Sequence, residues 1–333
     1  MISKGYLSVD CFFVLSGAVM SYVYSKSIAD KSLSWPAFMW KRFARLYPVH
    51  FVTILLAIVI LYVGPIVGFG AFPKYDFGKA VIFNTLALHG LGFLETLTLN
   101  YPSWSISAEF SAYAIFIPLA LLVFRIPSRF SYPIGVLAFL LYVSLFESLR
   151  PTSWSPENGT MALTHLTIRY SFLRIWPEFL LGLLTMRHFS QLSILNVTQT
   201  TIALISVSFV GLFSLFMSWD IVFVLCASVL IGIIYIGNMP NIKSLHFLGI
   251  ISYSLYMIHG LVEMVSFKMI EYIFGYGDNA VPLLFLPFVL AIAILAAYIV
   301  WATVEEPCRH FLTTRIEQPL STKVSVLVNI IHF

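Results

Sequence analysis

Residues 282–304 read PLLFLPFVLAIAILAAYIVWATV, a stretch of 23 residues without a charged side chain. A membrane-spanning helix needs about 20 mainly apolar residues, because each adds a rise of about 1.5 Å and the hydrocarbon core is about 30 Å thick. The stretch is therefore long enough and apolar enough to cross a bilayer as one helix.

Eight further segments have the same character, and together the segments predict about nine transmembrane helices. They cover residues 7–24, 47–70, 104–124, 132–149, 169–186, 199–217, 219–237 and 247–270. The composition agrees, since 59% of the 333 residues are hydrophobic and 10% are charged, whereas soluble domains carry roughly 25% charged residues. We expect an all-α fold, a polytopic membrane helical bundle.

Residues 80–94, AVIFNTLALHGLGFL, form a shorter apolar stretch that includes Asn84 and His89. A segment of this length and polarity fits a re-entrant or interfacial position better than a full crossing. We therefore expect 80–94 not to cross.

The Lys and Arg residues then divide unevenly between the two faces of the membrane. Twelve lie on one face, namely Lys26, Lys31, Lys41, Arg42, Arg45, Arg125, Arg129, Arg187, Lys243, Arg309, Arg315 and Lys323. Five lie on the other, namely Lys4, Lys74, Lys79, Arg150 and Arg169. The positive-inside rule puts the N-terminus outside and the C-terminus in the cytoplasm. The net charge of +4 thus reflects topology and predicts no nucleic-acid partner.

Arg42 and Arg45, in WKRFARLYPVH, lie three residues apart and so share one face of a helix. The planar guanidinium suits bidentate contact with phosphate oxygens, so the pair could clamp a phosphate-rich cytoplasmic ligand such as coenzyme A. The alternative is a topology anchor that touches lipid headgroups.

Three further sites carry ionisable side chains inside apolar segments, where charge is costly unless it is paired or lines a polar cavity. Glu109 is either a site residue or an interfacial carboxylate with access to water. His259 could act as a base or be a satisfied packing residue. Arg174 and Glu178 are one helical turn apart, so we expect them to pair with each other.

Several chemistries lack support in this sequence. It contains no P-loop, GxSxG elbow, HExxH helix or dinucleotide fingerprint, and its three cysteines have no metal-site spacing. We expect no metal. The non-enzyme alternative is a multi-pass transporter or structural membrane protein, for which internal repeats would be expected.

Six motifs follow one another along the chain: GYLSVDCFFVLSG at 5–17, RFAR at 42–45, WSISAE at 104–109, PEFLLG at 177–182, LGIISYSLYMIH at 248–259 and VEEPCRHF at 304–311. Together they resemble the acyltransferase 3 family, membrane O-acyltransferases that act on surface polysaccharides, lipids and antibiotics. The resemblance implies a domain over 1–311, followed by a cytoplasmic tail at 312–333.

The resemblance also implies an activity: O-acetylation or a related transfer from cytoplasmic acyl-CoA, with acetyl-CoA the expected donor, to a hydroxyl of a carbohydrate or lipid-linked acceptor. Arg42 and Arg45 would bind the donor, and Glu109 and His259 are the candidate catalytic residues. The expected location is the bacterial inner membrane, and polysaccharide modification is the expected role.

The sequence departs from the family pattern at its beginning. Family members have ten helices, the first of which precedes the GYLSVDCFFVLSG element and carries a basic residue and, eleven positions on, the presumed catalytic histidine. Here Met1 stands four residues before Gly5. A start codon assigned too late, an inactive truncated product, or replacement by His259 or His50 would each explain the difference.

Overall fold

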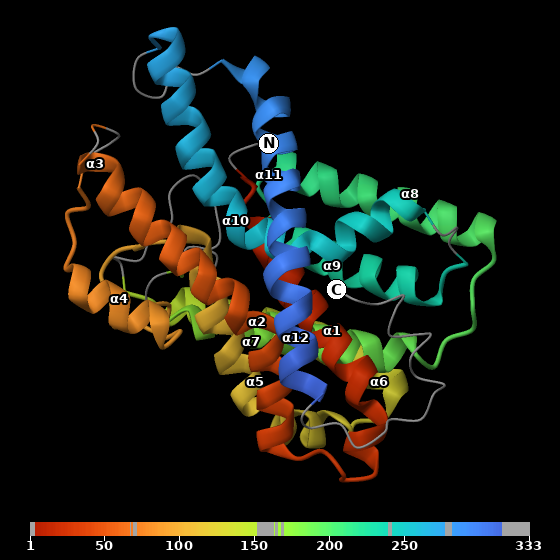
Figure 1. Cartoon of the computed structure of the whole chain (residues 1–333). Helices are drawn as coiled ribbons and strands as arrows, with labels where there is room; N and C mark the ends of the chain where they lie inside the picture. The colour runs from red at the N-terminus through yellow and green to blue at the C-terminus, as the bar shows by residue number, and fades with distance from the viewer. Residues whose placement is uncertain are drawn as a thin grey trace. The chain divides into compact units, whose positions relative to one another are not determined.

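The computed structural model describes residues 4–66, 68, 72–151, 163, 166–167, 170–238, 242–276 and 282–314. With the labels of Figure 1, the α-helices are α1 (Leu7–Ala29), α2 (Trp35–Ile58), α3 (Gly64–Ile66), α4 (Phe77–Thr85), α5 (Trp104–Val123), α6 (Ser128–Leu149), α7 (Ser171–Phe189), α8 (Val197–Phe216), α9 (Asp220–Ile236), α10 (Lys243–Phe274), α11 (Leu286–Val300) and α12 (Glu306–Thr314). Shorter 3-10 or π-helical turns are η2 (Val59–Val63), η3 (Tyr101–Ser103), η6 (Leu283–Phe285) and η7 (Trp301–Glu305). The expected all-α fold is confirmed.

All nine predicted segments correspond to helices within the described residues. Seven of the helices found there are long and apolar enough to cross a membrane. The other two predicted segments are α9, which is apolar but 17 residues long, and α7, which has 19 residues but carries Arg174, Glu178 and Arg187. The chain is therefore a polytopic helical membrane protein.

One predicted boundary differs from the structure, and the short stretch at 80–94 agrees with its prediction. The segment predicted to start at residue 47 belongs to a helix that begins at Trp35, so Arg42 and Arg45 lie inside α2 and not before it. In the stretch 80–94, α4 ends at Thr85 after nine residues, about 13 Å of helix, and the chain continues in turns. Such a helix is too short to cross, as expected for this segment.

The chain divides into two compact units, which are described separately. The first unit contains Met1–Trp35, Gly90–Gly92 and Ser107–Pro240, and the second contains Pro36–His89, Phe93–Ile106 and Asn241–Phe333. The first unit therefore holds α1 and α6 to α9 with most of α5. The second holds α2 to α4, η3 and α10 to α12.

In the first unit, α1 and α7 form the most extensive helix pair. Glycine allows their backbones to touch: a Cβ atom on Gly17 would lie 2.0 Å from the Phe179 carbonyl oxygen, and one on Gly182 would lie 1.9 Å from that of Val14. Small residues at such crossings are typical of membrane helices, whose association depends on close packing. The two glycines therefore set the distance between α1 and α7.

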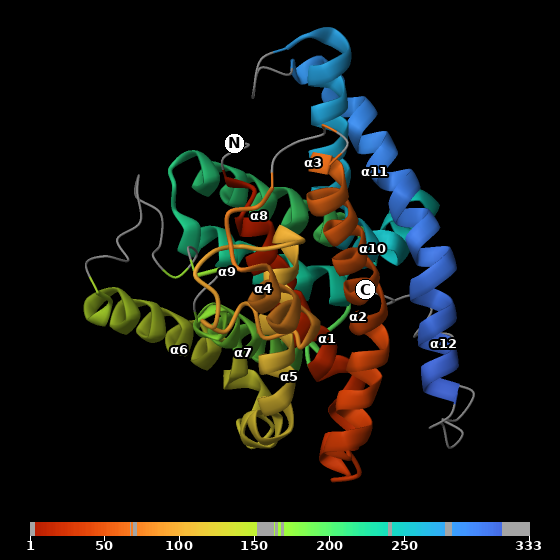
Figure 2. The same ribbon diagram turned by 60° about the vertical axis from the view of Figure 1, so that its left-hand side comes forward.

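In the second unit, α3 continues the direction of α2 through η2, and α10 runs beside α11 (Figure 2). Side-chain donors connect α2 to its neighbours: the Trp40 indole N–H donates to the Leu312 carbonyl at 2.9 Å, and the Tyr47 hydroxyl donates to the Thr85 carbonyl at 2.9 Å. These bonds attach α2 to both α12 and α4.

Local sequence explains where some helices begin. Asp76 caps α4 by accepting a hydrogen bond from the Lys79 backbone N–H at 3.0 Å. Asn196 and Gln199 form a reciprocal capping box at the start of α8. Each cap satisfies backbone donors that a helix leaves unpaired at its N-terminus.

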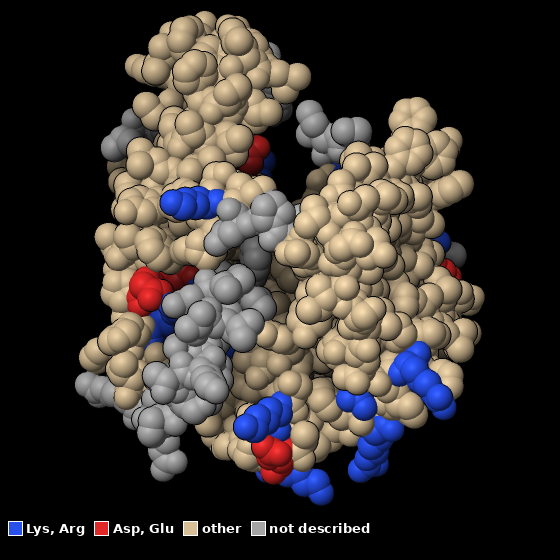
Figure 3. Space-filling model, turned by 90° about the vertical axis from the view of Figure 1, so that its right-hand side faces the viewer, with Lys and Arg blue, Asp and Glu red and all other residues tan. Residues whose placement is uncertain are grey.

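Few charges lie on the described surface. On the face shown in Figure 3, most atoms belong to residues other than Lys, Arg, Asp and Glu. Helix α8 is an example, since Phe209 is 71% exposed and Phe216 is 78% exposed. Apolar side chains exposed to this extent along a long helix are expected where lipid replaces water as the solvent.

Candidate active site

The second unit holds a half-buried Arg45 in an ion pair with a buried carboxylate. Its guanidinium Nη1 contacts Oε1 of Glu305, the last residue of η7, whose side chain is fully buried. The Ser254 hydroxyl, on α10, donates to the other Glu305 oxygen at 2.6 Å. The Arg45 guanidinium also lies 5.8 Å from the Tyr253 ring centroid. Glu305 thus fixes one part of Arg45, and among the described residues no further hydrogen bond occupies the other N–H groups of this guanidinium, which carries five.

Arg42 lies one turn before Arg45 on α2 and is half-buried. Its guanidinium carbon lies 5.8 Å from the Phe38 ring centroid, within the range of a cation–π contact. The RFAR motif therefore places two guanidinium groups on one stretch of α2, as its spacing predicts.

A second polar cluster in this unit is built around two histidines. The His50 and His89 rings stack with centroids 5.6 Å apart. His50 Nε2 lies 2.9 Å from the Asn84 carbonyl, so the ring nitrogen donates. The Ser103 hydroxyl donates to the Asn100 carbonyl at 2.7 Å and therefore accepts from His89 Nε2 at 2.9 Å.

Burial determines the charge of this cluster. His89 follows α4, outside the candidate spans, and is 5% exposed. Loss of solvation, followed by the neighbouring His50, lowers the pKa of His89 to about 3. The His89 ring is therefore neutral at physiological pH and serves as a hydrogen-bonding group.

The η3 segment joins this cluster to α10. The Asn100 amide donates to the Met257 carbonyl at 2.8 Å, and the Tyr256 hydroxyl donates to the Pro102 carbonyl at 2.8 Å. The residues just before the WSISAE motif are thus held by the SYSLYMIH motif, although the two are more than 140 positions apart.

His259 is half-buried on α10, one turn after Tyr256. Its Nδ1 lies 2.6 Å from the Tyr256 carbonyl oxygen, which can only accept, so Nδ1 carries the proton. In the neutral ring the lone pair is then on Nε2. The backbone therefore selects the tautomer that a general base would use.

Glu109 belongs to the first unit, on α5. Its Oε1 accepts a hydrogen bond from Ser16 Oγ at 2.9 Å and another from the Tyr113 hydroxyl. Ser16 lies in the VLSG part of the first motif, so the structure brings two of the six motifs together around this carboxylate. Arg42, Arg45 and His259 belong to the second unit.

The prediction that Arg174 pairs with Glu178 is wrong. Arg174 Nε and Nη2 each donate to Asp10 on α1 at 2.8 Å, and Nη2 also donates to the Tyr6 carbonyl at 3.0 Å. Asp10, Arg174 and Glu178 are all fully buried. Asp10 is the partner in place of Glu178, and the two oxygens of its carboxylate match two N–H groups of the planar guanidinium.

Sequence reasoning also missed Glu305 and the Ser103–His89 contact. The VEEPCRHF motif contains Glu305, but the sequence assigns it no role. The polar residues within the apolar stretch 80–94 are the signal that could have indicated the second cluster. Their partners are distant in the sequence, so spacing alone could not pair them.

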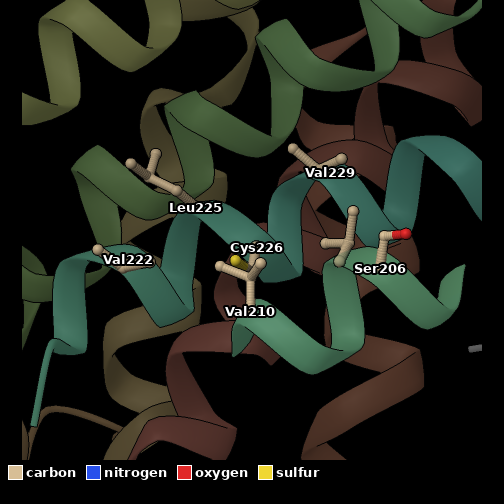
Figure 4. A pocket seen from close by; sticks show the side chains of 7 residues that line it. Ser206, Val210, Val222, Leu225, Cys226 and Val229 are labelled. Atoms are coloured by element: carbon tan, nitrogen blue, oxygen red, sulfur yellow. The ribbon is translucent and has the colours of Figure 1, made fainter. Parts of the chain in front are cut away.

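The first unit also contains an apolar groove of about 270 Å³ between α8 and α9 (Figure 4). Valine and leucine side chains line it, together with Ser206 and Cys226. None of these lining side chains is charged, so the groove lacks the arginine, histidine and carboxylate groups of the polar clusters described above.

The described residues thus form a polytopic helical membrane protein that buries arginine, histidine and carboxylate side chains, a combination that makes these polar clusters candidate sites. The chain belongs to the acyltransferase 3 family, whose model describes an acyltransferase domain and matches residues 5–302. The resemblance found in the six motifs is thereby confirmed.

Two curated relatives match parts of the chain. It is 32% identical over 164 residues to the acyltransferase MdmB of Streptomyces mycarofaciens, a match that covers 46% of this chain and 39% of that protein. It is 32% identical over 126 residues to protein 2 in the picA locus of Rhizobium radiobacter, covering 34% of this chain and 65% of that protein. The chain thus spans less than two thirds of each relative. No solved structure matches it.

Proposed function

We propose that this protein transfers an acyl group, with acetyl expected, from cytoplasmic acyl-CoA to a hydroxyl of a carbohydrate or lipid-linked acceptor. The observation that carries the proposal is the family match over residues 5–302, which includes five of the six motifs, RFAR and WSISAE among them. The alternative, a transporter or structural protein, has no comparable support.

Arg42 and Arg45 bind the donor in this proposal. Coenzyme A carries several phosphate groups, and two guanidinium groups on one helix can contact them at separate points. The contact between Arg45 and Glu305 supports this role, because it limits the conformations that Arg45 would lose on binding.

His259 acts as the general base. Its Nε2 takes the proton of the acceptor hydroxyl, whose oxygen attacks the thioester carbonyl. The C–S bond breaks, the thiolate leaves as the free thiol after protonation, and an ester forms on the acceptor. Glu109, held by Ser16 and Tyr113, is a second catalytic residue in this proposal.

The test is acyl transfer by purified protein in lipid nanodiscs, measured as CoA release and as radiolabelled acetyl product. We expect Arg42→Ala and Arg45→Ala to raise KM for acetyl-CoA, and Glu109→Gln and His259→Gln to lower kcat. Arg309→Ala, in a surface pair with Glu306, is the matched control for lost positive charge. Absence of CoA release in the wild type, or substrate flux without acyl transfer, would contradict the proposal.

We further propose that the chain lies in the bacterial inner membrane with the Arg42 face in the cytoplasm. The uneven distribution of Lys and Arg supports this orientation. The predicted tail at 312–333 would also be cytoplasmic, although 315–333 lie outside the described residues. A reporter enzyme fused after residue 333 should be active only in the cytoplasm, and periplasmic activity would overturn the orientation.

A further inference from the structure

Three side chains of the second unit meet on α10, away from the Arg45 contacts. The Tyr101 hydroxyl donates to Glu263 Oε2 at 3.2 Å. The Tyr101 ring also makes an edge-to-face contact with the His259 ring, with centroids 6.0 Å apart. His259 and Glu263 are four residues apart, so they share one helix face. Tyr101 therefore bridges an imidazole and a carboxylate.

Gly260 makes this arrangement possible. A Cβ atom at that position would lie 2.6 Å from a ring carbon of Tyr101. The glycine thus lets the tyrosine ring lie directly against α10 between His259 and Glu263. The contact between the Tyr101 ring and α10 therefore depends on glycine at position 260.

The atoms of this surface that remain able to form hydrogen bonds are acceptors. Among the described residues, no group is bonded to His259 Nε2 or to Glu263 Oε1, and both atoms are acceptors. His259 and Glu263 are half-buried, and Tyr101 is 39% exposed. An accessible pair of acceptors beside an aromatic ring fits a ligand that offers several O–H donors and an apolar C–H face.

We propose that Tyr101, His259 and Glu263 form the binding subsite for a hydroxyl-rich acceptor, a sugar or related polyol. The inference rests on the proposed acyl transfer and names where its acceptor binds. Glu263 accepts from a hydroxyl next to the reacting one, the Tyr101 ring contacts the C–H face, and His259 Nε2 takes the proton of the reacting hydroxyl.

The proposed acceptor subsite and the Arg45 site lie at different positions along α10. Ser254, which bonds to the Glu305 partner of Arg45, precedes Glu263 by nine residues on the same helix. At a rise of about 1.5 Å per residue, the two positions are about 13 Å apart along the axis. Donor phosphates and acceptor hydroxyls would therefore occupy different levels of α10.

The experiment compares two surrogate acceptors, methyl glucoside and ethanol, with acetyl-CoA as donor and protein in nanodiscs. We expect Glu263→Gln to raise KM for methyl glucoside at least about tenfold, because a hydrogen bond to a charged group is lost. The ethanol reaction and KM for acetyl-CoA should not change. Glu271→Gln is the matched control, since Glu271 lies on α10 and pairs with Lys268.

Tyr101 supplies a second variant. Tyr101→Phe should keep most glucoside binding, whereas Tyr101→Leu should lose it, because only the former retains the aromatic face. Equal losses for methyl glucoside and ethanol in Glu263→Gln, or no loss for either, would overturn the subsite.

Failure of the proposed function would look different. If the wild type releases no CoA with any acceptor, methyl glucoside binding is measured by saturation-transfer NMR, which requires no turnover. A signal that Glu263→Gln abolishes and Glu271→Gln retains supports the subsite. A signal unchanged in Glu263→Gln, or no signal in the wild type, overturns it.

Discussion

Replacing Arg174 should destabilise the protein more than loss of any surface ion pair. Arg174 and Asp10 are both fully buried, and two N–H groups of the guanidinium bond to the carboxylate at 2.8 Å. Glu178 is also fully buried on α7. The site therefore contains one cation and two acids, and Arg174→Gln leaves the acids without their cation.

The magnitude follows from burial. Breaking a buried pair by removing one partner costs about 3–5 kcal/mol, whereas an exposed pair contributes about 0–1 kcal/mol. We expect Arg174→Gln to lower the free energy of unfolding by about 4–5 kcal/mol and Asp10→Asn to lower it by about 3 kcal/mol. The double variant should lose less than the sum, because it removes the Asp10 carboxylate together with the cation that pairs with it.

The assay is unfolding in mixed micelles with increasing SDS, followed by circular dichroism, for the wild type, both single variants and the double variant. Arg309→Gln, which removes the half-buried pair with Glu306, is the control and should change stability by less than about 1 kcal/mol. A loss below about 1 kcal/mol for Arg174→Gln, or strict additivity in the double variant, would refute the assignment of this ion pair.

Three further predictions concern packing, pH and the donor site. Gly182→Ala should push α1 from α7, because its Cβ would lie 1.9 Å from the Val14 carbonyl oxygen; a thermal midpoint equal to that of the wild type would contradict this packing. Because the pKa of His89 falls to about 3 on folding, the unfolded chain binds more protons between about pH 6.5 and 3, so stability should fall as pH drops below about 6.5. Midpoints measured from pH 7 to 5 should fall less steeply in His89→Gln, and parallel slopes would count against a buried neutral ring. Glu305→Ala should free the Arg45 side chain and raise KM for acetyl-CoA several-fold while Glu305→Asp partly restores it; an unchanged KM in Glu305→Ala would show that Arg45 needs no such support.

The fold could be predicted because the signal is local. A crossing helix requires an apolar run of its own length, so segments such as 282–304 are visible without knowledge of their neighbours. Helix ends were less certain, as α2 shows: it begins at Trp35, and its first turns contain the charged residues Lys41 and Arg42, which a hydropathy window excludes although they are helical.

The contacts within the candidate sites could not be predicted in this way. Arg174 is four residues from Glu178 and 164 from Asp10, and proximity in the sequence favoured the wrong partner. Glu305 was visible as a motif residue, but its contact with Arg45 joins positions 260 apart. Residue types identified the sites, whereas the packing of helices decided which residues meet.

The continuity of α10 has a consequence for how such a protein can diversify. Its contacts with the Arg45 site and with Tyr101 lie on one uninterrupted helix of 32 residues. Inserting a single residue between Ser254 and Glu263 would rotate one end against the other by about 100° and lengthen the helix by about 1.5 Å. New substrate preferences are therefore more readily reached by exchanging side chains at fixed positions than by altering the spacing between them.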